Sequence, residues 1–591
     1  MSQSQSQIQQ PNQVEQSSKP AFNWKIAGEA GHGVMLASQL MAKLAKRHAM
    51  SAFNYLEYPS LIRGGHQTGQ VYADFDNVSC QHRDLDVIVI YTPAGFEVHQ
   101  DEITSDTIII YNSDFGPLDK AVEERYQGQI TQMPLSTWAK ETAGTGLAAN
   151  VVSLGVSSYL LGLSQELGLN LIQDTFKGNQ KLIQANEAAY IQGFNQAKQA
   201  ELNPLFQIKP AKDNQILLNG NEAIGMGLLA AGLQFYSAYP MTPATGLLHF
   251  MNEHKDHYSL VVKQVEDEIG AINEAIGAAV AGVRAATGSS GGGFALMTEA
   301  VSFAGVAEIP LVILEAQRTG PASGVPTWTA QADLQFVLTA GHGDFPKVVL
   351  TPGTVEEHFD LAQKAVYLAE KYQLPVIILS DKFILESHQT MSQPESRHKL
   401  ERYSQLEQSE LPEDDSYLRY KLTDSGISPR SLPGQKHGLH LANSYEHDQW
   451  GYATEDSEPI KAQVDKRDRK MQLVVKEVPE PVLYGPKQAE VTFIGWGSTI
   501  NVLQEVIKLM QEQGLEGKVN AIHLPCFKPL PVSALKKLTT QAQKLVMVEG
   551  NSNGQAENWL KQQAGIQMDD SLRRYDGRPF YAEDLVEYLC G

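Results

Sequence analysis

Three acidic residues stand at the start of an apolar stretch, KQVEDEIGAINEAIGAAVAGVRAATGSSGGG, which begins at Lys263. They are Glu266, Asp267 and Glu268. Isoleucine and valine recur at helical spacing after them, and alanine and glycine keep the other sides slim, so we expect a buried, central helix. Acidic side chains in a first turn offset the helix macrodipole. Alternatively, one carboxylate in a cleft could hold a strong hydrogen bond to a protonated heterocycle.

Two further segments carry residue types suited to chemistry. Arg318, in LEAQRTGPASG, follows a predicted strand, and its planar guanidinium suits bidentate capture of a carboxylate. The stretch AYPMTPAT contains Pro240 and Thr242, and its prolines end a strand because residues before proline are pushed out of helical space. Taken alone, an arginine after a strand is more often a surface residue, and SSGGG is a turn.

The order of elements predicts an α/β fold in three units. Residues 22–205 open with a strand, the glycine turn GEAGHGV and a helix; residues 214–388 alternate strands and helices as in a doubly wound parallel sheet; residues 486–591 begin with another strand, turn and amphipathic helix. The first turn reads GxxGxG rather than GxGxxG. A helix N-terminus there could hold a phosphate, but a tight strand-to-helix turn is the simpler interpretation.

Two polar segments lie outside these units. Residues 1–21 form a Gln/Ser-rich tail, which we expect to be disordered and which lacks the layout of a signal peptide. Residues 389–485 are rich in charge, proline and glycine, and we predict a linker that wraps over the body or a partner, because this composition cannot bury a core. No stretch reaches about 18 uninterrupted apolar residues, so no membrane span is expected.

Composition restricts the partners and the compartment. The chain has 591 residues and a formal net charge of -21, which argues against a nucleic-acid or anionic-membrane partner. Its three cysteines form no CxxC, so they give neither a disulfide framework nor the four thiolates of a cubane cluster. We predict no metal site on this chain, and a reducing cytoplasm is the expected location.

Several segments together resemble one enzyme family. Three segments resemble the α subunit of 2-oxoacid:ferredoxin oxidoreductases: YSAYPMTPAT, QVEDEIGAINEAIGAAVAGVRAATGSSGGGFALM and LEAQRTGPASGVPTWTAQADLQFVLTAGHGDFPKVVLTPG. Two more resemble the γ subunit of the same family: GEAGHGV and YPSLIRGGHQTG. The chain thus looks like a γ-α fusion, and the resemblance covers nearly everything after the tail. It implies a γ-type Rossmann-like domain, a pyrimidine-type thiamine-diphosphate-binding domain and a transketolase C-terminal-like domain.

The resemblance implies roles for four residues. Glu268 would hydrogen-bond the aminopyrimidine ring of thiamine diphosphate, where a carboxylate that exchanges a proton with the ring nitrogen helps to generate the carbanion nucleophile. Pro240 would lie near the cofactor, Thr242 would meet the keto-acid end of the substrate, and Arg318 would hold the substrate's carboxylate. Met241 departs from the isoleucine that is usual in the family's YPITPxS loop.

The resemblance also implies partners. The chain lacks the GDG and distant Asn that hold the diphosphate through magnesium, and the family places magnesium and an iron–sulfur cluster on a separate β subunit. We therefore expect a hetero-oligomer that is active only with that subunit. It would decarboxylate a 2-oxoacid, reduce ferredoxin and form an acyl-CoA, and the γ-like domain would help to bind coenzyme A.

The substrate and two other function classes stay open at this point. The chain looks most like the 2-oxoglutarate members of the family, which form succinyl-CoA, in its fused layout and in the segments QRTGPASGVPT and HGDFP. Pyruvate or a branched-chain 2-oxoacid is the alternative substrate. A non-catalytic scaffold would tolerate loss of Glu268 or Arg318, and both are present. A nucleotide-dependent dehydrogenase built on the first glycine turn predicts that residues 21–200 alone bind NAD tightly.

Overall fold

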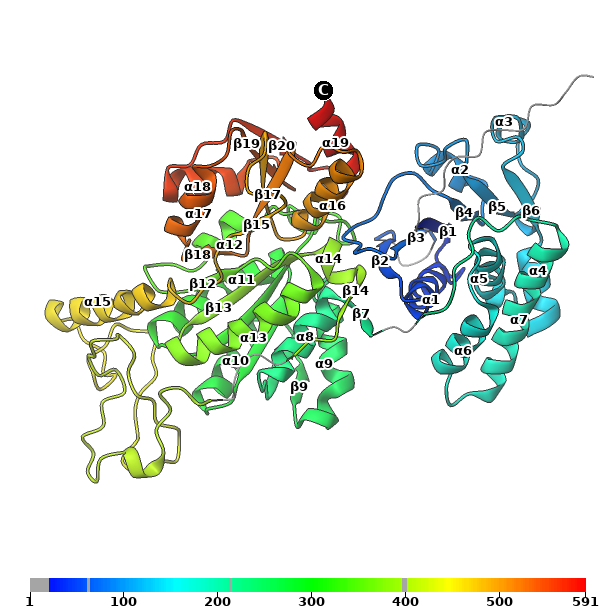
Figure 1. Cartoon of the computed structure of the whole chain (residues 1–591). Helices are drawn as coiled ribbons and strands as arrows, with labels where there is room; N and C mark the ends of the chain where they lie inside the picture. The colour runs from blue at the N-terminus through cyan, green and yellow to red at the C-terminus, as the bar shows by residue number, and fades with distance from the viewer. Residues whose placement is uncertain (1–20, 61–63, 212–213, 396–400) are drawn as a thin grey trace, which may run out of the picture.

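The computed structural model describes residues 21–60, 64–211, 214–395 and 401–591. Its strands form three β-sheets with helices packed on them, so the predicted α/β class is confirmed (Figure 1). Residues 1–20 of the predicted tail lie outside the described residues. No helix within the described ranges is both long and apolar enough to cross a membrane.

The first sheet has the strand order β6-β5-β4-β1-β3-β2-β14-β7. Strands β1, β4, β5 and β6 are parallel, whereas β3 runs antiparallel between β1 and β2. Its strands are β1 (Phe22–Glu29), β2 (Ser51–Glu57), β3 (His66–Asp74), β4 (Val87–Ile90), β5 (Ile108–Asn112), β6 (Ile130–Met133), β7 (Gln215–Asn219) and β14 (His388–Ser392). The amino-terminal helices are α1 (Val34–Arg47), α2 (Ala94–Val98), α3 (Lys120–Arg125), α4 (Leu135–Ala143), α5 (Ala149–Leu160), α6 (Gln165–Thr175) and α7 (Gln180–Gln199).

The second sheet has the order β18-β12-β13-β11-β10-β8-β9 and is parallel except for β18. Its strands are β8 (Phe235–Ala238), β9 (Val261–Gln264), β10 (Ala285–Ser289), β11 (Leu311–Gln317), β12 (Val348–Leu350), β13 (Pro375–Asp381) and β18 (Cys526–Lys528). One face packs on α8 (Gly220–Ala230), α9 (Thr245–Tyr258) and α13 (Val355–Tyr372). The other packs on α10 (Glu268–Val280), α11 (Gly291–Val306) and α12 (Leu334–Thr339). Because both faces are covered, the strands are nearly continuous apolar runs.

The third sheet, at the carboxyl end of the chain, has the order β15-β17-β16-β19-β20. Its strands are β15 (Val482–Tyr484), β16 (Val491–Trp496), β17 (Val519–Leu524), β19 (Leu545–Glu549) and β20 (Asp570–Arg573). The helices of this region are α16 (Thr499–Glu512), α17 (Val532–Thr539), α18 (Gln555–Ala564) and α19 (Ala582–Cys590).

Strands exchanged between regions join the three sheets. Strands β7 and β14 stand at the two ends of the central segment, yet they pair with each other and extend the first sheet through β2. Strand β18 comes from the carboxyl-terminal region and pairs with β12 of the second sheet. Figure 1 shows β14 and β7 between the two larger bodies. The backbone hydrogen bonds of these pairs therefore fix the regions relative to one another.

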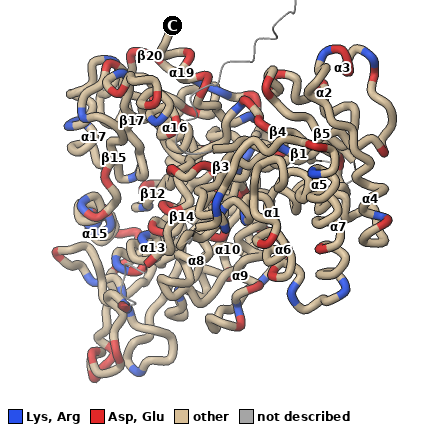
Figure 2. Tube along the Cα trace, turned by 45° about the vertical axis from the view of Figure 1, so that its right-hand side comes forward, with Lys and Arg blue, Asp and Glu red and all other residues tan. Residues whose placement is uncertain are grey.

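The polar segment at 389–485 contains a long helix, α15 (Ser457–Val474), that its composition did not predict. Figure 2 shows both signs of charge crowded along it. Lys466 and Lys470 are fully buried and bond the two oxygens of buried Glu308 at 2.5 and 2.7 Å. Burial alone would raise the pKa of Glu308, but the two lysines outweigh it and hold that pKa far below its usual range. Apart from its carboxyl-terminal end, where Val474 packs in the apolar core, the helix is thus anchored by buried ion pairs.

A histidine joins the first region to the carboxyl-terminal helices. The ring of His82 contacts Glu505 of α16 at 3.1 Å and Glu583 of α19 at 3.2 Å. Burial lowers the pKa of His82, but the two carboxylates outweigh it and raise that pKa to about 9. His82 is therefore an imidazolium at neutral pH, and it links two carboxylates across the contact.

This ion cluster predicts a specific pH dependence of stability. The folded-state pKa of His82 lies above the unfolded value of about 6.5, so its contribution is complete below pH 6.5 and is lost as the pH rises through about 9. We expect His82→Gln to destabilise the chain by on the order of 1–3 kcal/mol at pH 6 and by much less at pH 10. Thermal unfolding at both pH values, with exposed His257→Gln as the control, measures this. An equal loss at both pH values would contradict a charged His82.

Candidate active site

The four predicted site residues lie along one edge of the second sheet. Pro240 and Thr242 follow β8, Arg318 follows β11, and Glu268 is the first residue of α10. Strand β10 lies between β8 and β11. The carboxyl edge of an open parallel sheet is where such folds bind ligands. Side-chain hydrogen bonds and close contacts connect these segments.

The three carboxylates at the start of α10 differ in their surroundings. Asp267 is the N-cap, and its Oδ1 accepts a 2.7 Å hydrogen bond from the backbone N–H of Gly270. Glu266 is exposed. Glu268 is only 4% exposed, although its position in the first turn would allow it to reach water. The macrodipole therefore accounts for a capping Asp267, but it does not require a buried Glu268.

A serine hydroxyl contacts the Glu268 carboxylate, and a glycine leaves the space that this carboxylate occupies. Ser289, the last residue of β10 and fully buried, places its hydroxyl 3.5 Å from Glu268 Oε1 and 3.7 Å from the sulfur of Met241. A Cβ on Gly293 would lie 2.4 Å from Glu268 Oε1 and 2.1 Å from Ser289 Oγ. The SSGGG motif is thus the place where α11 approaches this carboxylate closely, and only glycine fits at position 293.

Arg318 is tied to the loop after β8. Its Nη1 donates a 2.8 Å hydrogen bond to the backbone carbonyl of Thr242, which leaves the other guanidinium N–H groups for a ligand. Among the described residues, no carboxylate forms an ion pair with Arg318. Burial lowers the pKa of Arg318, and Asp333 partly offsets this. The guanidinium remains positive and suits a carboxylate ligand.

The helix that begins at Glu268 is not wholly buried, in contrast to the expectation from sequence. One side of α10 packs on the sheet through Ile272 and Ile276, but Ile269 is 50% exposed and Gly277 has open space around it. On the neighbouring α11, Leu296 is 52% exposed. Small and apolar residues on this outer side of α10 and α11 are typical of helices that pack against other elements on both sides. The described residues supply only one of those sides.

These residues fit one half of a thiamine diphosphate site. A buried carboxylate with one oxygen on a serine and no cation partner in the described chain suits a hydrogen bond to a heterocyclic nitrogen. The same described ranges contain no group of three or more His, Cys, Asp or Glu residues that could hold a metal ion. The pyrimidine side therefore has a matching residue here, while the metal–diphosphate side has none within those ranges.

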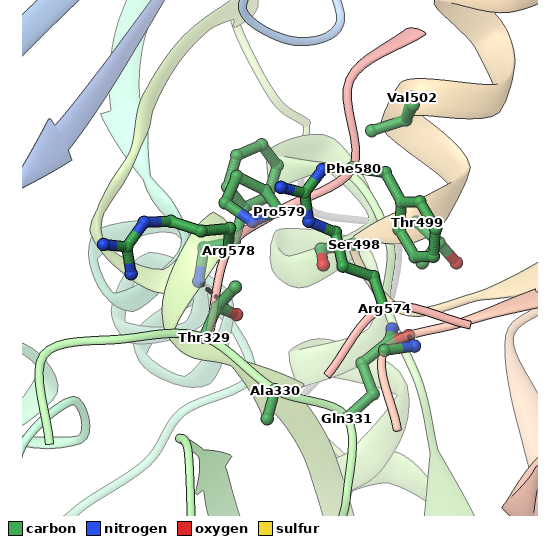
Figure 3. A pocket seen from close by; sticks show the side chains of 12 residues that line it. Thr329, Ala330, Gln331, Ser498, Thr499, Val502, Arg574, Arg578, Pro579 and Phe580 are labelled. Atoms are coloured by element: carbon green, nitrogen blue, oxygen red, sulfur yellow. Dashed lines mark hydrogen bonds between the residues drawn. The ribbon is translucent and has the colours of Figure 1, made fainter. Parts of the chain in front are cut away.

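A separate hollow lies where the central and carboxyl-terminal regions meet (Figure 3). It has a volume of about 350 Å³ and is lined by Thr329 and Gln331 below and by Arg574 and Arg578 at its sides. Arg574 pairs with Asp576 and Asp584 at 3.2 Å, and Arg578 lies over the ring of Trp328. The positive charges are engaged with neighbours, so this hollow is an interdomain gap apart from the Glu268 site.

Sequence reasoning missed three residues of the site, of which Ser289 and Glu315 are fully buried. The sequence predicts only a turn at Ser289, although its hydroxyl lies within hydrogen-bonding distance of both Glu268 and Met241. Glu315, inside β11, and Asp333, before α12, were not singled out. An acid inside an otherwise apolar strand, LVILEAQ, is the signal that could have identified Glu315, because buried carboxylates need a compensating partner.

In a comparison with known protein families, each of the two large segments of the chain matches a family model. Residues 226–466 match the family described as "Pyruvate flavodoxin/ferredoxin oxidoreductase, thiamine diP-bdg". Residues 23–196 match "Pyruvate ferredoxin/flavodoxin oxidoreductase". The central segment therefore matches a thiamine diphosphate-binding domain.

Whole-chain relatives agree with this assignment. The 2-oxoacid:ferredoxin oxidoreductase subunit alpha of a Sulfolobus species is 31% identical over 96% of this chain and 96% of its own length. The 2-oxoglutarate oxidoreductase subunit KorA of Mycobacterium tuberculosis is 27% identical over 96% of this chain and 90% of its own. The structure of 2-oxoglutarate:ferredoxin oxidoreductase from Magnetococcus marinus, with 2-oxoglutarate, coenzyme A and succinyl-CoA bound, has a TM-score of 0.88 at 29% identity and covers 97% of this chain and 99% of that one.

The close approach at Gly293 predicts opposite effects for two neighbouring substitutions. We expect Gly293→Ala to destabilise the chain by about 1–3 kcal/mol, because its Cβ overlaps Glu268 and Ser289. Gly292→Ala, which meets no atom within 4 Å, should be neutral or stabilising by up to about 1 kcal/mol through helix propensity. Thermal unfolding of the chain alone compares them. Equal behaviour of the two variants would refute the tight contact.

Proposed function

This chain belongs to the 2-oxoacid:ferredoxin oxidoreductases, as an alpha subunit of an oxidoreductase, and we propose that it supplies the pyrimidine side of their thiamine diphosphate site. The proposed reaction is oxidative decarboxylation of 2-oxoglutarate to succinyl-CoA with reduction of ferredoxin. The observation that carries the proposal is the buried Glu268, with the Ser289 hydroxyl beside its carboxylate and, on the same helix, an apolar side that the described residues leave open.

The chain's own residues have distinct tasks in this proposal. Bound thiamine diphosphate would supply the nucleophilic carbon and the electron sink. Glu268 exchanges a proton with the pyrimidine nitrogen through its carboxylate, a task that requires an acid and that a glutamine could not perform. Arg318 orients the substrate through its carboxylate, Thr242 meets the keto-acid end, and Pro240 lines the cofactor's place. Burial of Glu268 excludes water from the proton transfer.

A β subunit completes the proposed site. The exposed side of α10 and α11, which includes Ile269, Gly277 and Leu296, is the surface that we assign to it. We further propose that the β subunit holds magnesium for the diphosphate and an iron–sulfur cluster for transfer to ferredoxin. The three cysteines of this chain are unpaired and two of them are buried, which agrees with a reducing cytoplasm and with electron transfer elsewhere.

Coenzyme A is the proposed co-substrate, and the amino-terminal region offers it a cleft. A cleft of about 850 Å³ lies beside the first glycine turn, at the carboxyl ends of β1, β4 and β5. His32 stacks on Tyr91 with ring centroids 5.4 Å apart and meets Phe115 edge-on at 5.0 Å, while Lys140 supplies a positive charge. Aromatic rings and a cation suit an adenine base and phosphates.

The other functions considered from sequence have less support. The match of residues 23–196 to the oxidoreductase family disfavours a separate nucleotide-dependent dehydrogenase. A non-catalytic scaffold would not need a buried carboxylate in place of an apolar residue at position 268, because burying it costs free energy. The relatives named for 2-oxoglutarate favour that substrate, with pyruvate or a branched-chain 2-oxoacid as the alternative.

The role of Glu268 is tested with the chain co-expressed with its β subunit. We expect anaerobic, coenzyme A-dependent reduction of a viologen dye, faster with 2-oxoglutarate than with pyruvate, and a loss of at least about a hundredfold in Glu268→Gln. Glu266→Gln removes the same charge from an exposed neighbour and should leave the rate unchanged. Full activity in Glu268→Gln would refute the proton-transfer role, while a preference for pyruvate would change only the substrate.

The proposed interface predicts the effect of a bulky residue on α10. A side chain at Gly277 meets no atom of this chain within 4 Å, so Gly277→Trp should fold normally. The same side chain would obstruct a subunit seated on α10, so we expect the variant to lose co-purification with the β subunit. Gly517→Trp, in another open position near β17, is the control. Retained association in Gly277→Trp would place the interface elsewhere.

A further inference from the structure

A second acidic residue is buried one strand away from the Glu268 site. Glu315 of β11 is in register with Ser289 of β10, so both side chains lie on the same face of the sheet. That face carries α10 and α11, because Ile313, two residues before Glu315, packs in their core. Glu315 is fully buried, and neither of its carboxyl oxygens receives a hydrogen bond from a nitrogen or hydroxyl donor.

The partner of Glu315 is another acid, Asp333. The two carboxyl groups lie within hydrogen-bonding reach, and two carboxyl groups can bond only when one of them carries a proton. Burial raises the pKa of Glu315 well above its usual range, and the charge of Asp333 raises it further. The pair therefore keeps one proton and one negative charge at neutral pH.

The negative charge of the pair interacts electrostatically with Arg318. The Asp333 backbone N–H donates a 3.0 Å hydrogen bond to Gln317, the residue before Arg318, and a Cβ on Gly291 would lie 2.7 Å from Asp333 Oδ2. The charge of Arg318 lowers the pKa of Asp333, although burial raises it more. Asp333 is thus the carboxylate of the pair, close enough to act on Arg318 and yet not in an ion pair with it.

Other ionisable groups near the pair have partners of their own. Glu268 bonds Ser289 on β10. Asp381, at the end of β13 on the other side of β11, accepts hydrogen bonds from Thr329 and from the backbone N–H of Phe383. Arg318 is therefore the group that the charge of the pair acts on.

We propose that Asp333, kept as a lone carboxylate by its proton-bearing neighbour Glu315, is a positioning residue that sets how tightly Arg318 holds the carboxylate of the 2-oxoacid. This inference rests on the proposed function of Arg318. The substrate's carboxylate and Asp333 share one guanidinium, so Asp333 weakens the grip on the substrate. When the carboxylate leaves as carbon dioxide, Asp333 remains as the counter-charge of Arg318. The pair thus opposes tight binding of the unreacted 2-oxoacid. Tight binding of this ground state would not speed the reaction.

Two variants separate the charge of the pair from its packing. Glu315→Gln replaces the protonated acid by a neutral group of the same shape and keeps the charge on Asp333. The double variant Glu315→Gln/Asp333→Asn removes that charge in the same background. In the complex with the β subunit, we expect Glu315→Gln to resemble wild type at pH 7. We expect the double variant to lower KM for the 2-oxoacid by about three- to tenfold, with kcat unchanged or reduced.

A purely structural role would not lower KM. An unchanged or raised KM in a double variant whose thermal midpoint matches that of Glu315→Gln would overturn the proposal. Asp344→Asn, which removes one charge from an exposed position, is the control and should leave KM unaltered. Absence of coenzyme A-dependent reduction by the wild-type complex with any 2-oxoacid would instead refute the proposed function.

The shared proton has a readout that needs no activity. The infrared spectrum of this chain at neutral pH should contain a protonated-carboxyl C=O stretching band that shifts in D₂O. The band should be lost in Glu315→Gln and kept in Asp344→Asn. A spectrum in which Glu315→Gln removes no such band would overturn the proton-sharing pair directly.

Discussion

A carboxylate buried without a positive partner is the constraint on which the site depends. Removing Glu268 from water costs free energy, and the described chain offers its carboxylate one serine hydroxyl at 3.5 Å. Neighbouring residues hold Glu268 in this buried position. Asp267 caps α10 so that the helix begins at Glu268, and Gly293 lets the next helix approach to a distance that no other residue allows. The remaining hydrogen-bonding capacity of Glu268 is what a heterocyclic ligand would use.

The site also depends on contacts that fix the regions of the chain relative to one another. The residues that follow β8, β10 and β11 form the site only while the sheet edge is rigid. Strands β7, β14 and β18 pair across regional boundaries, and the buried cluster of Glu308, Lys466 and Lys470 fixes α15 against the central body. The outer side of α10 and α11 is the exception, because its apolar residues remain open. A rigid half-site with one open apolar side is the form expected of a subunit that is completed by another chain.

Much of this was predictable from sequence because strong local patterns dictate it. The β-branched runs and glycine turns predicted the α/β class. The family resemblance singled out Glu268, Thr242 and Arg318, and in the fold Arg318 bonds the backbone of Thr242. Features that depend on distant pairing were not predictable. Helix α15 buries lysines in place of an apolar stripe, so its helical period has no apolar signal. The Glu315–Asp333 pair joins residues from separate elements, and only the fold shows that the Glu315 carboxyl has no nitrogen or hydroxyl donor among the described residues.

The central claim is that this chain carries one half of a thiamine diphosphate site built around Glu268. The most direct test is calorimetric titration of thiamine diphosphate with magnesium into three samples: this chain alone, its complex with the β subunit, and the same complex with Glu268→Gln. We predict no measurable binding to the chain alone, tight binding to the complex, and weaker binding to the variant complex. Tight binding to the chain alone, or equal binding by both complexes, would contradict it.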